Sequence, residues 1–100
     1  HRGVDHNTAW PTGLVPWAFY ELAVMNIYEI IGENIRGFRN RKNWTQEKLS
    51  IRADINTNYL GNIERAEKKV SIDTLLKLGK VLNIEPHIFL IRDAYKKDPV

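Results

Sequence analysis

The stretch "WTQEKLSIRADINTNYLGNIER", residues 44–65, decides the fold of this chain. It predicts two short helices, at about residues 46–53 and 56–64, separated by a brief turn. The second helix is rich in Asn and Thr, which are poor helix formers because their short side chains compete for backbone hydrogen bonds. Leu60 and Ile63 nevertheless keep the apolar spacing of a helix face. The polar residues of this helix therefore call for an explanation other than helix stability.

Helical periodicity continues on both sides of this stretch. A first helix is predicted at about residues 27–42, a fourth after Ser71 and a fifth from Pro86, and no segment shows the alternation of a strand. Thr45, Asn56 and Ser71 are the predicted N-caps. The residues predicted to face the core are Ile31, Ile35, Phe38, Leu49, Ala53, Ile55, Leu60, Ile63, Leu75, Leu78 and Leu82, and the fifth helix carries Ile88, Phe89, Ile91 and Tyr95. The predicted fold class is all-α, with five helices and a central helix-turn-helix.

The composition indicates one small globular domain. The chain has 100 residues, 43% of them hydrophobic, and no cysteine, which excludes disulfides, thiol catalysis and cysteine-ligated metal sites. No apolar run reaches the roughly 20 residues that a membrane helix needs, and no signal peptide is evident. We expect a cytoplasmic protein that does not interact with membranes.

The first 24 residues differ from the rest of the chain. They mix Gly and Pro with aromatic residues, and the orderly helical pattern begins only after Met25. This favours a leader or foreign segment at residues 1–24, followed by a domain at residues 25–100. The alternative is an aromatic N-terminal arm, because Pro16 is suited to start a helix.

Positive charge is concentrated near the predicted helix-turn-helix. The formal net charge is +3, yet residues 36–52 hold six basic side chains against Glu47 alone. Such a run is often only a solvated helix face. Beside a helix of hydrogen-bonding side chains, it is instead typical of a nucleic-acid binder.

The sequence contains no recognisable catalytic or cofactor site. The histidines at positions 1, 6 and 87 are scattered, and we find no Ser/His/Asp set, paired carboxylates, glycine-rich phosphate loop or metal-binding cluster. The protein is therefore not expected to be an enzyme, and no cofactor, metal or small-molecule ligand is predicted.

Residues 30–91 resemble the lambda-repressor-like (Cro-type, XRE) helix-turn-helix DNA-binding family. The matching positions are Gln46, Leu49, Ser50, Ala53, Ile55, Leu60, Ile63, Glu64 and Arg65, together with "SIDTLLKLGKVL" at residues 71–82. Three positions depart from the family pattern. Asp54 stands where the family usually has a turn glycine, and Ala66 and Val70 replace its usual Gly and Pro in the connector after the third helix.

The resemblance implies that the third helix reads DNA bases in the major groove, where Asn pairs with adenine and Thr offers a hydroxyl or a methyl contact. The implied base readers are Thr57, Asn58, Asn62 and Asn56. The alternatives are that Asn56 only caps the helix and that Asn62 is only a surface residue. The predicted phosphate contacts are Gln46, Tyr59, Lys48, Arg36, Lys42, Lys68 and Lys69. In similar proteins an ion pair equivalent to Arg39 and Glu64 orients the recognition helix.

The predicted partners are double-stranded DNA and a second copy of the chain. The last two helices carry more apolar residues than one domain can bury, which favours a dimer interface. These residues are Leu76, Ile84, Phe89, Leu90 and Ile91, with the last three predicted to form the interface. The predicted function is a dimeric regulator of a palindromic operator, of which a restriction-modification controller is the preferred kind and a phage-type repressor or antitoxin autoregulator the others. The alternative is a protein-interaction adapter without DNA binding.

Overall fold

The structure is a computed structural model that describes residues 16–97, with side chains from residue 26 onward. Its elements are α2 (Pro16–Arg41), α3 (Gln46–Ala53), α4 (Thr57–Glu64), α5 (Ile72–Leu82), the 3-10 helix η1 (Pro86–Leu90) and α6 (Ala94–Lys97). No strand occurs among these residues. The predicted all-α class with a central helix-turn-helix, formed by α3 and α4, is confirmed.

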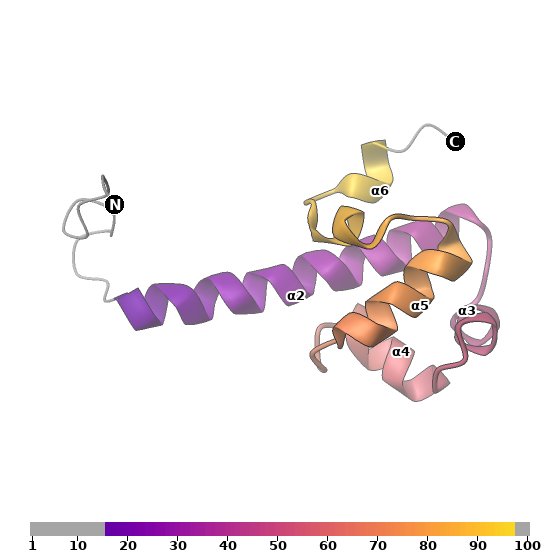
Figure 1. The fold of residues 1–100 in the computed structure, drawn as a ribbon, viewed down its shortest axis with the longest axis horizontal. Helices are drawn as coiled ribbons and strands as arrows, with labels where there is room; N and C mark the ends of the chain where they lie inside the picture. The colour runs from indigo at the N-terminus through magenta and orange to yellow at the C-terminus, as the bar shows by residue number, and fades with distance from the viewer. Residues whose placement is uncertain (1–15, 98–100) are drawn as a thin grey trace.

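The long helix α2 begins at Pro16, as the alternative prediction allowed, rather than near residue 27. Its 26 residues span about 39 Å. Figure 1 shows that the C-terminal part of α2 packs on the other helices, while its N-terminal part projects beyond them. The predicted boundary after residue 24 lies within this helix, and residues 1–15 lie outside the described part of the chain. The assignment of residues 1–24 therefore stays a prediction.

The core is built from the apolar faces of α2, α3, α4 and α5. Every predicted core residue of these helices is buried, and Ile55 in the α3–α4 turn packs against them half-buried. Phe38 of α2 also meets Phe89 of η1 edge-on, with ring centroids 6.0 Å apart. Phe89 is 0% exposed, so its predicted place in a dimer interface is wrong. It closes the core of its own domain instead.

The predicted fifth helix is divided in two. Pro86 does open a helical element, but it is the 3-10 helix η1, and Ile91 then adopts an extended backbone. Asp93 follows in the left-handed region, with φ of 60°, before the single turn of α6. The chain is drawn out here because the carbonyls of Phe89 and Ile91 both accept hydrogen bonds from Asn34 on α2.

Asn34 is a fully buried polar residue that holds the C-terminal segment against α2. Its Nδ2 donates to the carbonyls of Phe89 at 2.8 Å and Ile91 at 2.7 Å, and its Oδ1 accepts from the Tyr95 amide at 3.3 Å. One turn along the same helix face, Gly37 leaves room for the Tyr95 ring, with which a Cβ at that position would clash. These contacts fix α6 and make the burial of the Asn34 amide favourable.

Left-handed residues follow the four helices α2 to α5, with Asn43 after α2 at φ of 60°. Asn83 ends α5 as predicted, with φ of 60°. Asp54 adopts φ of 57° after α3, so the turn keeps the conformation that the family's glycine usually supplies. Ala66 adopts φ of 60° after α4, which costs free energy because its Cβ approaches the following carbonyl. Within residues 16–97, no helix is long and apolar enough to cross a membrane.

Candidate nucleic-acid interface

The crossing of α3 and α4 fixes the direction of α4. Ser50 of α3 is fully buried, and its Oγ donates to the Glu47 carbonyl at 2.8 Å. The same Oγ lies 2.7 Å from Oγ1 of Thr57, the first residue of α4. Only a small side chain fits at this crossing. Because its hydroxyl already has a partner inside the protein, Thr57 is better placed to offer a base its methyl group.

The other predicted base readers differ in how many hydrogen bonds their side-chain amides already form within the protein. Asn56 is the N-cap of α4, with Oδ1 accepting from the Tyr59 amide at 3.1 Å. Asn62 accepts from Nη2 of Arg65 at 2.7 Å. Asn58 is exposed and forms no side-chain hydrogen bond within the described part of the chain. Asn58 therefore presents the most complete donor and acceptor pair on the outer surface of α4.

Arg39 and Glu64 form a buried, bidentate ion pair between α2 and α4. Nε of Arg39 lies 2.8 Å from Oε2 of Glu64, and Nη2 lies 3.0 Å from Oε1. Nη1 of the same guanidinium donates to the Trp44 carbonyl at 2.9 Å. Charge-assisted bidentate pairs are strong and directional, so this single side chain ties the end of α4 to α2 and to the turn before α3.

Gln46 is engaged by the same ion pair. Its Nε2 donates one hydrogen to Oε1 of Glu64 at 2.9 Å, which leaves the second N–H of the amide for the predicted phosphate contact. The backbone amides at the start of α3 still favour an anion, because they lie at the positive end of the helix. The phosphate contact of Gln46 stays a prediction, to which these main-chain amides would add.

The remaining predicted phosphate contacts are spread over α2, α3, α4 and the connections between α2 and α3 and between α4 and α5. Arg36 is exposed on α2, Lys68 and Lys69 are exposed in the α4–α5 connector, and Tyr59 is half-buried against the core. Nζ of Lys69 lies 6.0 Å from the centre of the Tyr28 ring. Lys42 and Lys48 are brought together, because each ammonium lies 5.5 Å from the centre of the Trp44 ring.

Sequence reasoning missed the part that Trp44 and Arg52 play in this arrangement. The Arg52 guanidinium lies 4.8 Å from the centre of the same half-exposed indole. A contact of this kind contributes about 0.5–1 kcal/mol at an exposed site. The available signal was the spacing of Lys48 and Arg52, which lie four and eight residues after Trp44 and so share one face of α3.

No group of three or more metal-binding side chains occurs among the side chains that the structure describes, those of residues 26–97. Among the described residues, the site therefore consists of amides, hydroxyls, cations and one half-exposed aromatic ring. These are the groups that contact base edges and phosphates in DNA-binding proteins.

Comparisons with known sequences agree with this arrangement. The family model described as "Helix-turn-helix" matches residues 35–89. The control protein C.SmaI of Serratia marcescens is 36% identical over 78 residues, which cover 78% of this chain and 93% of that protein. The control protein C.BamHI of Bacillus amyloliquefaciens is 36% identical over 62 residues, covering 61% of this chain and 76% of that protein.

Solved structures give the same result. The restriction-modification controller protein C.AhdI from Aeromonas hydrophila superposes with a TM-score of 0.60 at 33% identity, covering 64% of this chain and 96% of that chain. The N-terminal DNA-binding domain of SinR from Bacillus subtilis gives 0.62 at 30% identity, covering 65% and 96%. The chain belongs to the XRE-type helix-turn-helix family of DNA-binding transcription regulators, whose members are not enzymes.

Proposed function

We propose that this protein is a dimeric regulator that reads a palindromic operator through α4 and controls restriction-modification genes from a cytoplasmic location. The observation that carries the proposal is the exposed Asn58 amide in the first turn of α4. Residues at this end of a recognition helix enter the major groove. The contacts of Ser50 with Thr57 and of Arg39 with Glu64 hold the helix in one direction, as base reading requires.

The likeness to controllers supports the narrower role. C.AhdI is described as a restriction-modification controller, and this chain covers 96% of it. C.SmaI and C.BamHI are both control proteins, and this chain covers 93% and 76% of them. The similarity thus extends over most of each relative rather than over the helix-turn-helix alone, which favours a regulator of the same kind.

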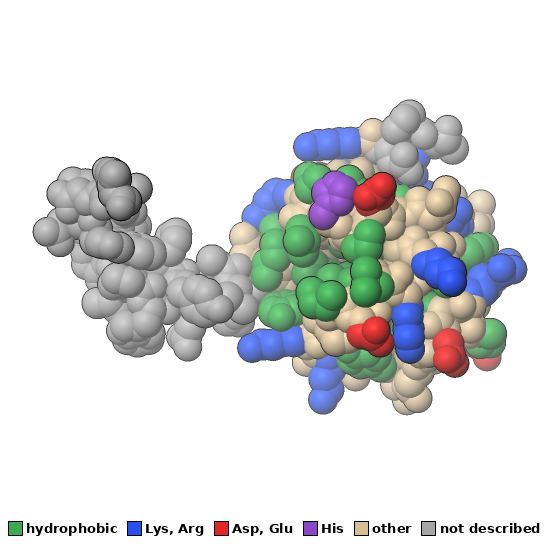
Figure 2. All heavy atoms as spheres, in the orientation of Figure 1, with side chains coloured by type: hydrophobic (Ala, Val, Ile, Leu, Met, Phe, Trp, Pro, Cys, Tyr) green, Lys and Arg blue, Asp and Glu red, His purple; other side chains and the backbone are tan. Residues whose placement is uncertain are grey.

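Exposed apolar side chains on the last elements support the proposed dimer. Leu76 of α5, Leu90 of η1 and Ile91 are 53%, 44% and 43% exposed. Figure 2 shows hydrophobic side chains gathered on the face over α5 and η1. Ile91 also borders a hollow of about 310 Å³ whose apolar lining includes Phe38 and Ile88. A symmetric pairing would set two recognition helices about 34 Å apart, on successive major grooves of a palindrome.

The proposal is tested by selecting sites from random DNA and then measuring the binding of two variants to the selected and to a scrambled sequence. Asn58→Ala should lose about 1–3 kcal/mol on the selected site and little on scrambled DNA, because it removes a base contact. Lys48→Ala should lower the affinity for both DNAs alike and reduce the salt slope by about one. Asn26→Ala, which alters an exposed amide on α2, is the matched control.

Two results would contradict this proposal. Equal losses on both DNAs for Asn58→Ala would show that α4 does not read sequence through this residue. The slope of log K against log salt is expected to be about −5 or steeper for the dimer, since each half-site engages several phosphates. A flat salt response, with no selected site, would favour the protein-interaction adapter.

A further inference from the structure

We propose that Trp44, Lys42, Lys48 and Arg52 form a docking surface for the DNA backbone beside α4, on which the indole ring orders the three cations. We call these four residues the Trp44 surface. The inference rests on the proposed operator binding and adds to it, because it gives Trp44 and Arg52 a role in DNA recognition. It also makes Lys42 and Lys48 parts of one surface rather than two independent contacts.

Three cations converge on one aromatic ring. The Arg52 guanidinium lies 4.8 Å from the ring centre, and the ammonium groups of Lys42 and Lys48 each lie 5.5 Å from it. Lys42 and Trp44 belong to the α2–α3 turn, whereas Lys48 and Arg52 lie one helical turn apart on α3. The negative face of an indole attracts cations, so the ring limits the positions that these flexible side chains adopt.

The charge of the Trp44 surface is not compensated within the protein. None of its three cations forms an ion pair with another residue of the described range. Glu47, the acidic residue beside Lys48, is exposed and also lacks an ion pair there. Like charges held close together repel one another, and a polyanion would relieve this repulsion. Duplex DNA carries a negative charge about every 1.7 Å along its axis, which suits a compact group of cations.

One guanidinium connects the Trp44 surface to the base-reading helix. The Trp44 carbonyl accepts from Nη1 of Arg39 at 2.9 Å, while Nε and Nη2 of the same residue hold Glu64 at the end of α4. Phosphates bound at the Trp44 surface would therefore lie in a fixed relation to Asn58. Contacts of this kind set the register of a protein on the duplex without reading its sequence.

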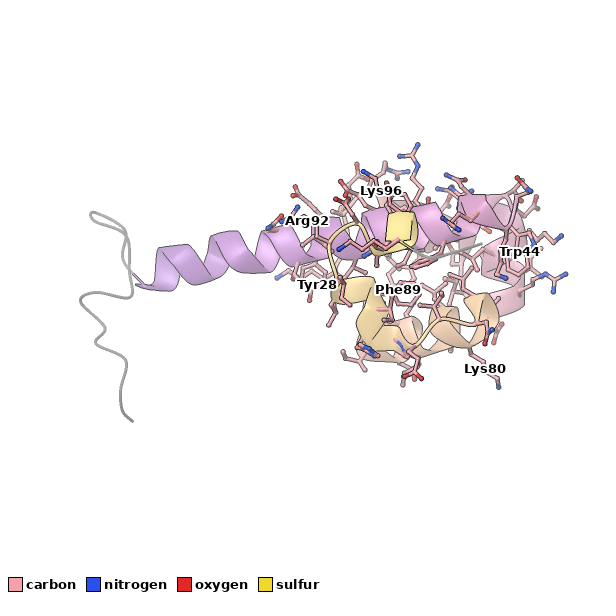
Figure 3. The ribbon with its side chains drawn as sticks, turned by 90° about the horizontal axis from the view of Figure 1, so that it is seen from above. Tyr28, Trp44, Lys80, Phe89, Arg92 and Lys96 are labelled. Carbon is pink, nitrogen blue, oxygen red and sulfur yellow. The ribbon has the colours of Figure 1, made fainter. Side chains whose placement is uncertain are left out.

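A pair of cation variants tests the inference. Arg52→Gln removes a cation from the Trp44 ring. Lys96→Gln removes one that lies 5.8 Å from the centre of the Tyr95 ring and 3.6 Å from Oδ1 of Asp93. Figure 3 shows Lys96 on α6, away from Trp44 at the end of the molecule where α2 meets α3. Arg52→Gln should lower the affinity for selected and for scrambled DNA by the same factor and reduce the salt slope by about one. Lys96→Gln should leave both affinities unchanged.

Variants of Trp44 that remove no charge test whether the ring itself orders the cations. Trp44→Leu should lower the affinity for both DNAs several-fold, and Trp44→Phe should restore most of it because a smaller aromatic face remains. Trp44 packs partly against the core, so thermal melts of both variants must accompany the binding data. If Trp44→Leu does not fold, the Arg52→Gln measurement still decides whether the surface binds DNA.

The outcomes separate this inference from the proposed operator binding. If Arg52→Gln binds both DNAs with wild-type affinity, the proposed role of the Trp44 surface is wrong. This result is independent of Asn58→Ala, whose selective loss of operator binding would still support base reading by α4. If the wild-type protein binds selected and scrambled DNA equally, operator recognition is wrong. A loss of affinity for both DNAs in Arg52→Gln would then still support the Trp44 surface. Failure of Trp44→Phe to recover any affinity would overturn the ordering role of the ring.

Discussion

At the scale of single residues, the clearest strain lies at Ala66. Its φ of 60° costs an alanine about 1–2 kcal/mol. Glycine avoids that cost but loses about 0.4–1 kcal/mol through the greater freedom of the unfolded chain. We therefore expect Ala66→Gly to raise the free energy of unfolding by about 0.5–1 kcal/mol, measured by chemical denaturation.

Asp54→Gly is the matched comparison, because Asp54 has nearly the same φ, 57°. Asp tolerates the left-handed region better than Ala does, so the gain at this position should be smaller. If Ala66→Gly instead lowers the free energy of unfolding with an unchanged denaturant slope, the packing of the Ala66 side chain stabilises the fold by more than its backbone strain costs.

Local chemistry made some residues predictable and left others out of reach. The caps Thr45, Asn56 and Ser71 are confirmed. They were predictable because a cap side chain bonds only to backbone amides two or three residues away. Asn34 was not predicted, since its role depends on the carbonyls of Phe89 and Ile91, 55 and 57 residues away. An isolated sequence does not reveal which distant groups will face a buried amide.

At the scale of elements, the pair of Arg39 with Glu64 determines how firmly α4 is held. Removing Arg39 alone, as in Arg39→Met, leaves a buried carboxylate without its main partner and should cost about 3–5 kcal/mol of stability. The double variant Arg39→Met/Glu64→Leu should recover most of that stability, because no buried charge remains. Its operator affinity should nevertheless stay below wild type, since α4 is no longer tied to the Trp44 carbonyl through Arg39.

Denaturation and operator titration of the two single variants and the double variant form a double-mutant cycle that checks this expectation. A double variant with both wild-type stability and wild-type operator affinity would show that core packing alone orients α4. Losses that simply add would show that the two side chains do not act as a pair.

The elements also show the limit of periodicity. Ile88, Phe89, Ile91 and Tyr95 have the apolar spacing of one helix, yet they lie on η1, α6 and the extended link between them. Periodicity reports which residues are apolar, whereas the break at Ile91 follows from the hydrogen bond that its carbonyl makes to Asn34. Pro86 was sufficient to predict where the segment starts, because its fixed φ favours the first turn of a helix.

At the scale of the whole molecule, the sequence was sufficient for the fold class but not for the surface. The core of α2 to α5 was predictable because buried positions repeat at helical spacing. Phe89 was assigned to the wrong surface, because an apolar residue in a short element has the same sequence signal in a core and in an interface. Burial separates the two: Phe89 is 0% exposed and Leu90 is 44% exposed.

That separation leads to a prediction about assembly. Leu90→Glu places a charge at the proposed interface, where pairing would remove it from water, and should raise the dimer dissociation constant about tenfold or more, equivalent to ~1.4 kcal/mol or more. Sedimentation across a concentration series measures this constant. The fold should be retained, because Leu90 is exposed within its own domain.

Ile51→Glu is the control, since Ile51 is an exposed apolar residue, at 70%, on α3 rather than on α5 or η1. It should leave the dissociation constant unchanged. If the proposed dimer is correct, Leu90→Glu should also lose the advantage that a complete palindrome has over a single half-site, because two linked recognition helices bind with a higher effective concentration than one. A wild-type protein that stays monomeric at high concentration would show that the proposed dimer is wrong. Equal effects of Leu90→Glu and Ile51→Glu on the dissociation constant would place the interface elsewhere.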